Sequence, residues 1–472
     1  MSLKESFFKN LLTVSFFAYL AQAFNYLASI FIFRIITPDE YGVVSMIVVF
    51  SGFIAIFSDA GFSFSVIRGN YNLKFLNKLS GATVIFGLLL SLLLVSMAKP
   101  ISWFYNSPEL FLPTICLAST FFLQSFSIIP KAKLQKEEEF KAIGIATVAM
   151  QLSNSSTQLA LALSGFSFWA FIWGPIVGYI VQAIVYYRKT RLSINITSLQ
   201  ELKKTYTEVK SLVGNVSGFN MINYWARNSD YMMIGKLYDK ATLGVYRNAY
   251  FLLMLPINFV GMVINQVFLP TIQKAVNSSR QKFEKEYIYL EGSLFLFALP
   301  LTIIFITLPK ELVQLIWGNN WIAVAEYLPY FGVLCFTQTS LNPIGIGYIV
   351  LKKEHELLKI GGINAIILII AIISGAIIST ESLVFYYSIA STIIVSPIFI
   401  YFAFIKAFKF NLNKVLKNWI PKIVLCFSML ICIHFDFQSV IYLLLLLLTM
   451  ITVVTEFNKI SWVVKYIIRI KK

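Results

Sequence analysis

Long apolar segments recur from one end of the chain to the other, and short polar loops separate them. Each segment has about 20 residues, the length that a helix needs to cross a hydrocarbon layer roughly 30 Å thick. Lipid offers the backbone no hydrogen-bond partner, so such segments must form helices. The pattern predicts an all-α, polytopic membrane protein with about 14 transmembrane helices. The expected spans cover residues 11–33, 41–66, 79–98, 110–129, 142–163, 166–187, 213–235, 242–267, 288–308, 323–350, 360–379, 382–405, 419–434 and 439–457.

Lysine and arginine are distributed unevenly between the loops on the two sides of the predicted membrane. With the N-terminus in the cytoplasm, the segments on the cytoplasmic side hold most of these residues, including Lys422 and Lys459. The opposite loops hold only Arg34, Lys99, Lys236, Lys240 and Lys310. Because positive charge marks cytoplasmic loops, the bias predicts a multi-pass protein with both termini cytoplasmic.

Composition argues against several other classes of protein. Hydrophobic residues make up 58% of the 472 residues and charged residues 13%, whereas soluble domains carry roughly 25% charged residues. The formal net charge of +17 resides in short loops between apolar segments, so it orients the chain in a membrane and does not indicate a nucleic-acid partner. The four cysteines lie in apolar segments without metal-binding spacing, and no GxxxxGK[ST] motif is present to bind ATP. We expect membrane lipids around the protein and no cofactor or metal.

A weak internal repeat divides the chain. Residues 34–42 and 236–244 each run from a basic residue to a glycine, at a constant offset of 202 residues. Six predicted spans separate the copies, so both enter the membrane in the same direction, as in a parallel repeat of two six-helix lobes. Apolar residues at helical spacing between 199 and 212 also predict an amphipathic helix on the cytoplasmic face. We predict an N-lobe at 1–190, a linker at 191–212, a C-lobe at 213–405, and two further helices with a basic tail at 406–472.

Polar residues share one face of several predicted spans. In the seventh span, Asn220, Asn223, Arg227 and Asp230 fall within an arc of about 80° at 100° per residue. The first span has Gln22 and Asn25 on one face, the eighth has Arg247 and Asn258, and the fifth has Gln151, Asn154, Ser155 and Gln158. A charge near the middle of a membrane is costly, so it usually faces a partner or a wet cavity.

Two interpretations of these polar faces stay open. Arg227 and Asp230 fit a structural ion pair three residues apart on one helix, and the amide faces fit hydrogen bonding between helices. The functional interpretation is a hydrated, cationic cavity, lined by Arg227, Arg247, Asn223, Asn220, Asn25, Gln22 and Asn258.

Other acidic residues are less informative. Asp230 and Asp59 are candidates for coupling an ion, and Asp59 alternatively anchors hydrogen bonds within its lobe. Glu291 lies near the end of a predicted span, where exposure to water is expected. Neither histidine, His355 or His434, is placed for catalysis, so no catalytic residue is predicted.

Several motifs together carry a resemblance to a known family. They are Arg34-Ile-Ile-Thr-Pro-Asp-Glu-Tyr-Gly42, Asp59-Ala-Gly-Phe with Arg68, Asn228-Ser-Asp-Tyr-Met-Met-Ile-Gly235, Leu243-Gly-Val-Tyr246 and Leu255-Pro256. With the pattern of spans, they make the whole chain resemble the polysaccharide flippases of the multidrug/oligosaccharidyl-lipid/polysaccharide exporter superfamily. The resemblance implies an inner-membrane transporter, not an enzyme, that moves an undecaprenyl-pyrophosphate-linked oligosaccharide of O-antigen or exopolysaccharide to the outer leaflet. Other polysaccharide assembly proteins are candidate partners.

Two other functions fit parts of the sequence. An ion-coupled drug or metabolite exporter of the same superfamily would need an acidic cavity, and the charges predicted to face the cavity are net basic. A membrane polysaccharide polymerase or lipid-linked glycosyltransferase generally needs a large external loop with catalytic groups. The largest predicted external loop, 309–322, has Glu311 as its only acid. We therefore favour the flippase.

Overall fold

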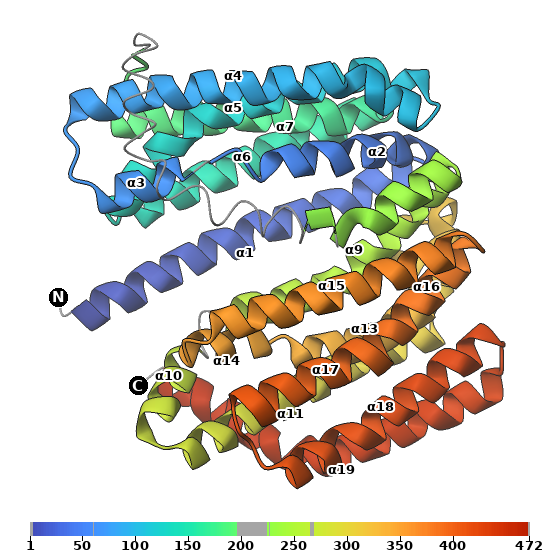
Figure 1. The fold of residues 1–472 in the computed structure, drawn as a ribbon. Helices are drawn as coiled ribbons and strands as arrows, with labels where there is room; N and C mark the ends of the chain where they lie inside the picture. The colour runs from blue at the N-terminus through green and yellow to red at the C-terminus, as the bar shows by residue number, and fades with distance from the viewer. Residues whose placement is uncertain (1–2, 60, 196–223, 226, 265–268, 471–472) are drawn as a thin grey trace. The chain divides into compact units, whose positions relative to one another are not determined.

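The computed structural model describes residues 3–59, 61–195, 224–225, 227–264 and 269–470, and every regular element within these ranges is a helix. Internal packing divides the chain into two compact units, Met1–Gly244 and Val245–Lys472. Each unit is a bundle of long helices (Figure 1). The predicted linker at 191–212 lies almost wholly outside the described residues, and the predicted lobe boundaries remain predictions.

Among its described residues, the first unit contains seven complete helices, a short 3-10 helix and the helical residues 224–225 and 227–237. The bounds are α1 (Leu3–Ile35), α2 (Pro38–Ala55), α3 (Phe62–Arg68), α4 (Leu73–Phe104), η1 (Pro108–Leu110), α5 (Phe111–Lys136), α6 (Phe140–Leu163) and α7 (Trp169–Thr190). Helix α9 (Lys240–Val263) begins in this unit and continues into the second.

The second unit has a larger share of short or irregular helices. They are α10 (Leu269–Ser278), α11 (Arg280–Thr307), α12 (Pro309–Trp317), η3 (Asn319–Glu326), α13 (Leu328–Leu341), α14 (Ile344–Val350), α15 (Glu354–Ala376), α16 (Thr380–Ile389), η4 (Ala390–Val395), α17 (Ser396–Ile400), η5 (Tyr401–Ala407), α18 (Leu412–His434) and α19 (Gln438–Ile470). Elements η4 and η5 are π-helical, so the single span predicted at 382–405 is a helix with two wide turns.

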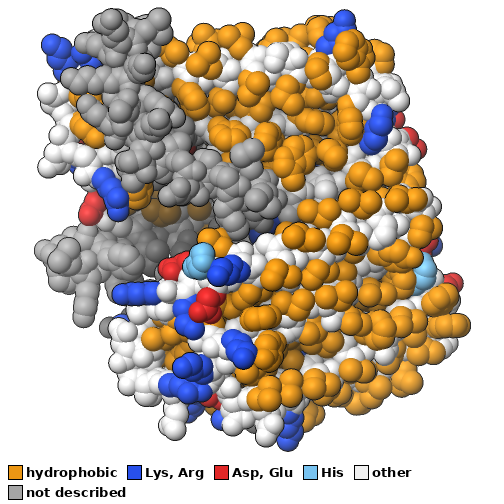
Figure 2. All heavy atoms as spheres, in the orientation of Figure 1, with side chains coloured by type: hydrophobic (Ala, Val, Ile, Leu, Met, Phe, Trp, Pro, Cys, Tyr) orange, Lys and Arg blue, Asp and Glu red, His pale blue; other side chains and the backbone are white. Residues whose placement is uncertain are grey.

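Eleven helices within the described ranges are long and apolar enough to cross a membrane, which confirms the predicted all-helical, multi-pass class. The count of about 14 is not confirmed by this criterion. The predicted spans at 142–163 and 242–267 correspond to α6 and α9, which are helical but carry several polar side chains. In Figure 2, hydrophobic side chains cover most of the visible flank of the second unit, as expected for a surface that faces lipid.

The predicted second span is shorter than expected. The sequence predicted one helix over 41–66, but α2 ends at Ala55 and α3 begins only at Phe62. Gly61, which precedes α3, has a φ of 76°, a left-handed conformation that glycine adopts without strain and that breaks the helix. Asp59 therefore lies in an exposed turn and not inside a span.

The start of α2 follows directly from its sequence. The hydroxyl of Thr37 accepts a hydrogen bond from the Glu40 amide at 3.4 Å, and the Glu40 carboxylate accepts one from the Thr37 amide at 2.7 Å. Pro38 occupies the first helical turn, where its missing N–H costs nothing. This capping box ends α1 and starts α2 within a few residues.

Loops that the charge bias placed on the same side of the membrane meet at the same end of the first unit. Lys240 forms ion pairs with Glu109 at 2.7 Å and Asp39 at 3.1 Å, and hydrogen bonding to Glu109 raises the pKa of Lys240. At the other end, Lys189 pairs with Glu139 at 3.5 Å. These contacts agree with the predicted alternation of loops, whichever side is cytoplasmic.

The 202-residue spacing of the sequence repeat also separates the residues of a close helix contact within the first unit. A Cβ added to Gly42 would overlap the carbonyl oxygen of Lys240, and one added to Gly244 would overlap the carbonyl oxygen of Pro38. The two glycines, 42 and 244, are separated by 202 residues, and so are the two residues whose carbonyl oxygens they approach, 38 and 240. Equivalent residues of the two copies thus contact each other reciprocally, as a pseudo-twofold arrangement requires.

We expect Gly42→Ala to destabilise the protein by roughly 1–3 kcal/mol, because the added methyl group forces backbone apart. Gly361→Ala is the matched control, since a Cβ at Gly361 meets nothing within 4 Å. Thermal unfolding of the purified full chain in detergent measures both. Equal melting temperatures for the two variants would show that the contact is not as close as described.

Candidate functional site

A hydrogen-bonded polar seam joins α1 and α6 in the first unit. The Gln151 side-chain amide donates to Asn25 Oδ1 at 2.9 Å and to Ser155 Oγ at 3.1 Å. On the same helix, Gln158 donates to Asn154 at 2.9 Å. The polar face predicted on the fifth span therefore turns toward the polar face predicted on the first.

This seam favours a packing role for Gln151, because its donor groups are already used between helices. Asn25 and Gln22 are only half-buried. The carbonyl oxygen of Asn25 accepts the bond from Gln151, so the Asn25 amide group remains the part of this side chain suited to a further contact.

Residues 224–225 anchor the following helix on α2. The Tyr224 hydroxyl donates to the backbone carbonyl of Val49, and the Trp225 ring lies 5.3 Å from that of Phe53 and 6.3 Å from that of Phe50, centroid to centroid. A Cβ added to Gly52 would overlap the Tyr224 hydroxyl, so this glycine leaves room for the tyrosine. The two aromatic residues therefore pack within the first unit.

The charged residues predicted on this helix have different environments. Arg227 is exposed, whereas Asp230 is 3% exposed and its Oδ1 accepts a hydrogen bond from the Tyr231 amide at 2.9 Å. Asn220 and Asn223 lie outside the described residues, so the single polar face predicted for the seventh span remains a prediction.

The other predicted cavity residues lie in the second unit or in turns. Arg247 is half-buried and Asn258 is exposed, both on α9. Asp59 accepts a hydrogen bond from the Ser63 amide at 3.0 Å and so supports the start of α3. The convergence of all these residues on one cavity remains a prediction.

Sequence analysis missed a buried charge network between α11, α18 and α19. Lys422, counted above among the cytoplasmic segments, is 1% exposed inside α18, where its ammonium group lies 2.8 Å from Glu456. Glu456 is fully buried and also pairs with Lys459. Glu291, expected to be water-exposed, is 3% exposed and accepts hydrogen bonds from Trp419 at 3.0 Å and Asn418 at 3.3 Å.

The expected exposure of Glu291 was wrong and the pairing of Lys422 was not predicted, for the same reason. The positive-charge rule places a lysine by its position in the sequence, whereas Lys422 and Glu456 lie 34 residues apart and meet only when α18 and α19 fold back on each other. The one available sequence signal was an acid within an apolar segment, since Glu456 falls at the end of a predicted span. Buried, paired charges of this kind fix how helices pack.

Removing one charged partner from this buried network is expected to lower the free energy of unfolding. Lys422→Met should destabilise the protein by roughly 3–5 kcal/mol, because the fully buried Glu456 carboxylate loses its buried partner and keeps only Lys459. Lys414→Met is the control, because Lys414 forms an exposed pair with Glu284 at 3.4 Å and should cost about 0–1 kcal/mol. Thermal unfolding in detergent compares the two variants. If both are equally stable, the charges are not buried together.

Two solved structures of membrane proteins share this helical fold. The solved structure described as lipid II flippase MurJ in an inward closed conformation matches with a TM-score of 0.65 at 13% identity, over 94% of this chain and 99% of that one. An inward-facing multidrug resistance MATE family transporter of the MOP superfamily matches with a TM-score of 0.63 at 14% identity, over 83% of this chain and 96% of that one. At such low identity these matches show the fold alone.

Sequence comparison then gives the family. The sequence model of the family described as "Polysaccharide biosynthesis protein" matches residues 31–326, well over half of the chain. The protein belongs to this family, which confirms the resemblance drawn from its motifs.

Curated relatives are similar over part of their length. The teichuronic acid biosynthesis protein TuaB of Bacillus subtilis is 23% identical over 62% of this chain and 60% of its own. The lipopolysaccharide biosynthesis protein WzxC of Escherichia coli is 22% identical over 66% of this chain and 63% of its own. The amylovoran biosynthesis protein AmsL of Erwinia amylovora is 24% identical over 58% of this chain and 71% of its own. The match thus spans less than two thirds of the length of TuaB and of WzxC.

Proposed function

We propose that this protein is a flippase that moves an undecaprenyl-pyrophosphate-linked oligosaccharide of O-antigen or exopolysaccharide from the inner to the outer leaflet of the cytoplasmic membrane. The observation that carries the proposal is the exposed guanidinium of Arg227, which extends from a helix of a polysaccharide biosynthesis family protein with a flippase-like fold. An arginine exposed on such a helix is costly unless it faces water or an anion.

A diphosphate needs a cationic path through the membrane. Guanidinium groups donate several hydrogen bonds in a fixed plane and match phosphate oxygens in pairs, so they offset part of the hydration that phosphate loses. We assign this role to Arg227 and Arg247. Within the substrate path we place the amides of Asn220, Asn223, Asn25, Gln22 and Asn258, which match sugar hydroxyls in hydrogen-bonding capacity.

Transport by alternating access fits the parallel repeat, with each lobe moving as a body around a central site. We propose that both termini are cytoplasmic, in keeping with the charge bias of the loops. An inside-negative potential then favours outward movement of the anionic substrate by about 2.3 kcal/mol per charge and 100 mV. Membrane lipids surround the protein, and other polysaccharide assembly proteins are its proposed partners.

Two acidic side chains are proposed to couple an ion. Asp230 has the better support, because its carboxylate is 3% exposed within a helix that also carries Arg227. Asp59 lies in an exposed turn, where its carboxylate supports the start of α3. An ion at Asp230 would be released or bound as the helix changes its surroundings.

The alternative function is ion-coupled export of drugs or metabolites, which the fold similarity to a multidrug transporter keeps open. Arginines in the substrate path would repel the cations that such exporters carry. Accumulation of a cationic dye in cells with and without the protein separates the two functions, since a polysaccharide flippase leaves dye levels unchanged.

We expect Arg227→Ala and Arg247→Ala each to lower surface polysaccharide by about 10- to 100-fold, the loss expected when a charged hydrogen bond to the substrate is removed. Surface polysaccharide is measured in a deletion strain that expresses each variant, and membrane fractionation confirms insertion. Arg280→Ala is the control, because Arg280 is exposed at the first residue of α11.

Normal export by both cavity variants would remove the basis of the proposed substrate path. Loss of export in the control as well would point to a general defect in folding or insertion.

A further inference from the structure

A pocket of about 350 Å³ opens at the end of the second unit where α18 begins. It lies between the first half of α11, the chain from η5 to α18, and the second half of α19. Apolar side chains form much of its wall, and three ammonium groups complete it. These residues are Ile288, Phe404, Phe410 and Val415, and Lys414, Lys417 and Lys459. Charge bias assigns this end of the helices to the cytoplasmic side.

The lysines give the pocket hydrogen-bond donors for an anion. Lys417 is exposed and forms no ion pair within the described part of the chain. Lys414 pairs with Glu284 at 3.4 Å, and Lys459 pairs with the buried Glu456. An ammonium group has three N–H donors, so each of these lysines keeps donors that its carboxylate partner does not use. Phosphate oxygens are suitable acceptors for them.

A buried hydroxyl in the same lining also lacks a partner. Tyr287 is 1% exposed, and its hydroxyl forms no hydrogen bond with any described residue. The carboxylate that lines the pocket, Glu291, already accepts hydrogen bonds from Trp419 and Asn418. Native proteins seldom leave a buried hydroxyl unpaired. The Tyr287 hydroxyl is therefore suited to donate to an oxygen atom of a bound molecule.

An apolar groove of about 440 Å³ adjoins the pocket, and Val415 lines both. It lies between α18 and the irregular stretch η4–α17–η5, and every residue that lines it is Ile, Leu, Val, Pro, Phe, Tyr or Trp. On α18 the lining runs from Leu412 to Phe427, about 22 Å along a helix. One leaflet of hydrocarbon is roughly 15 Å thick, so the groove is long enough for an acyl chain. Beside it, the Lys406 ammonium lies 5.6 Å from the centre of the Tyr401 ring.

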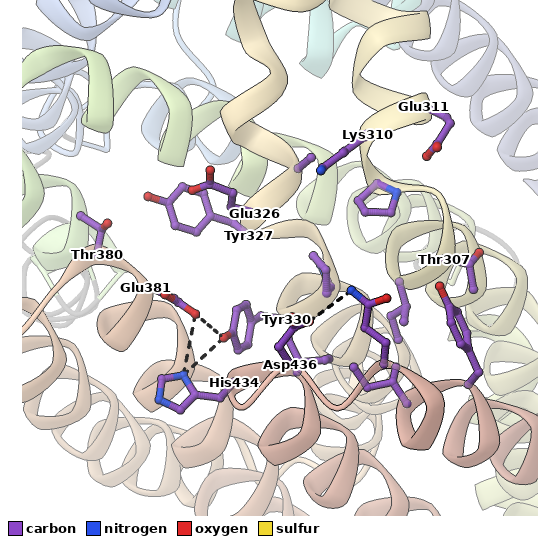
Figure 3. Close-up of a pocket in the computed structure, with 18 residues that line it drawn as sticks. Thr307, Lys310, Glu311, Glu326, Tyr327, Tyr330, Thr380, Glu381, His434 and Asp436 are labelled. Atoms are coloured by element: carbon purple, nitrogen blue, oxygen red, sulfur yellow. Dashed lines mark hydrogen bonds and ion pairs between the residues drawn. The ribbon is translucent and has the colours of Figure 1, made fainter.

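The pocket at the opposite end of the second unit is acidic (Figure 3). It is lined by the end of α11, the start of α16 and the α18–α19 turn. There Glu381 accepts a hydrogen bond from Tyr330 at 3.0 Å, and His434 Nδ1 lies 3.9 Å from the same carboxylate oxygen (Figure 3). The charged residues of this lining are Glu311, Glu326, Glu381, Asp436 and Lys310. An anion is thus attracted to the end at which α18 begins and repelled from the other.

We propose that the pocket and the groove together bind one anionic phospholipid, with its phosphate at Lys414, Lys417 and Lys459 and one acyl chain along α18. A free phosphate ester would leave the groove empty, whereas a phospholipid fills both spaces. A headgroup that carries its own cation would meet the three ammonium groups less favourably than an anionic one. Basic pockets between membrane helices on the cytoplasmic side are known to suit such headgroups. Neither lining contains Arg227 or Arg247, so the site is separate from the proposed substrate path.

Thermal unfolding of the full chain tests the site in nanodiscs of phosphatidylcholine, with and without phosphatidylglycerol. Because a bound ligand stabilises the folded state, phosphatidylglycerol should raise the melting temperature by about 2–4 °C. Lys417→Gln should lose most of this gain. Lys359→Gln is the matched control and should keep the gain, since it removes one charge from an exposed position on α15 outside the pocket.

Tyr287→Phe separates lipid binding from packing. The substitution keeps the ring, and the melting temperature in phosphatidylcholine should not fall, because the lost hydroxyl has no partner among the described residues. The gain from phosphatidylglycerol should shrink. A loss of stability that is equal with and without phosphatidylglycerol would show that the hydroxyl serves the protein itself. An equal gain in every variant would show only a general attraction between a basic protein and an anionic surface. Either result would overturn the proposal.

A second comparison, in detergent, distinguishes the possible sources of the phosphate. Phosphatidylglycerol, glycerol phosphate and undecaprenyl phosphate are each added to the full chain at the same concentration. The proposed site predicts a gain in melting temperature with phosphatidylglycerol and none with glycerol phosphate. An equal gain with glycerol phosphate would indicate a site for free anions, and a gain with undecaprenyl phosphate alone would indicate a site for the proposed substrate lipid. Both outcomes would contradict a phospholipid site.

Discussion

Hydrocarbon cannot donate or accept hydrogen bonds, and this constraint shapes every part of the protein that lies in the membrane. The backbone satisfies its hydrogen bonds by forming helices throughout the described chain. Polar side chains form hydrogen bonds with one another, as Gln151 and Asn25 do between α6 and α1. Charged side chains form ion pairs, since Lys422 and Glu456 are almost completely buried and directly paired. Polar side chains of the bundle thus differ in whether the protein itself supplies their partner.

That distinction separates the polar residues into two groups. Gln151, Glu291 and Lys422 have partners within the bundle, and their role is to fix helix packing. Arg227 is different, because it is exposed although it lies on a helix of the bundle. The flippase proposal depends on this contrast, since an anionic headgroup can balance such a charge during passage.

Close glycine contacts and buried charges both hold helices together in this protein. In the first unit, glycines allow close approach of backbone, as Gly42 does at the Lys240 carbonyl and Gly52 at the Tyr224 hydroxyl. In the second unit, buried charges and aromatic clusters bind α11 to α18 and α19, with the Lys422 ammonium 4.3 Å from the centre of the Phe295 ring. Glycines let helix backbones approach closely, whereas paired buried charges help to fix how helices pack.

The membrane class, the all-helical fold, the alternation of loops and the polysaccharide biosynthesis family can be predicted from the amino-acid sequence, because apolar length, loop charge and short motifs are local properties. Capping at Thr37 and Glu40 is equally local and sets the start of α2. The pairing of polar residues depends on the fold, because Lys422 contacts Glu456, and His434 contacts Glu381, between helices that are distant in the chain. The burial of Glu291 and the exposed turn at Asp59 could not be predicted from the sequence either. Hydropathy gives the length of an apolar segment, but it does not show which partners the polar residues of that segment contact.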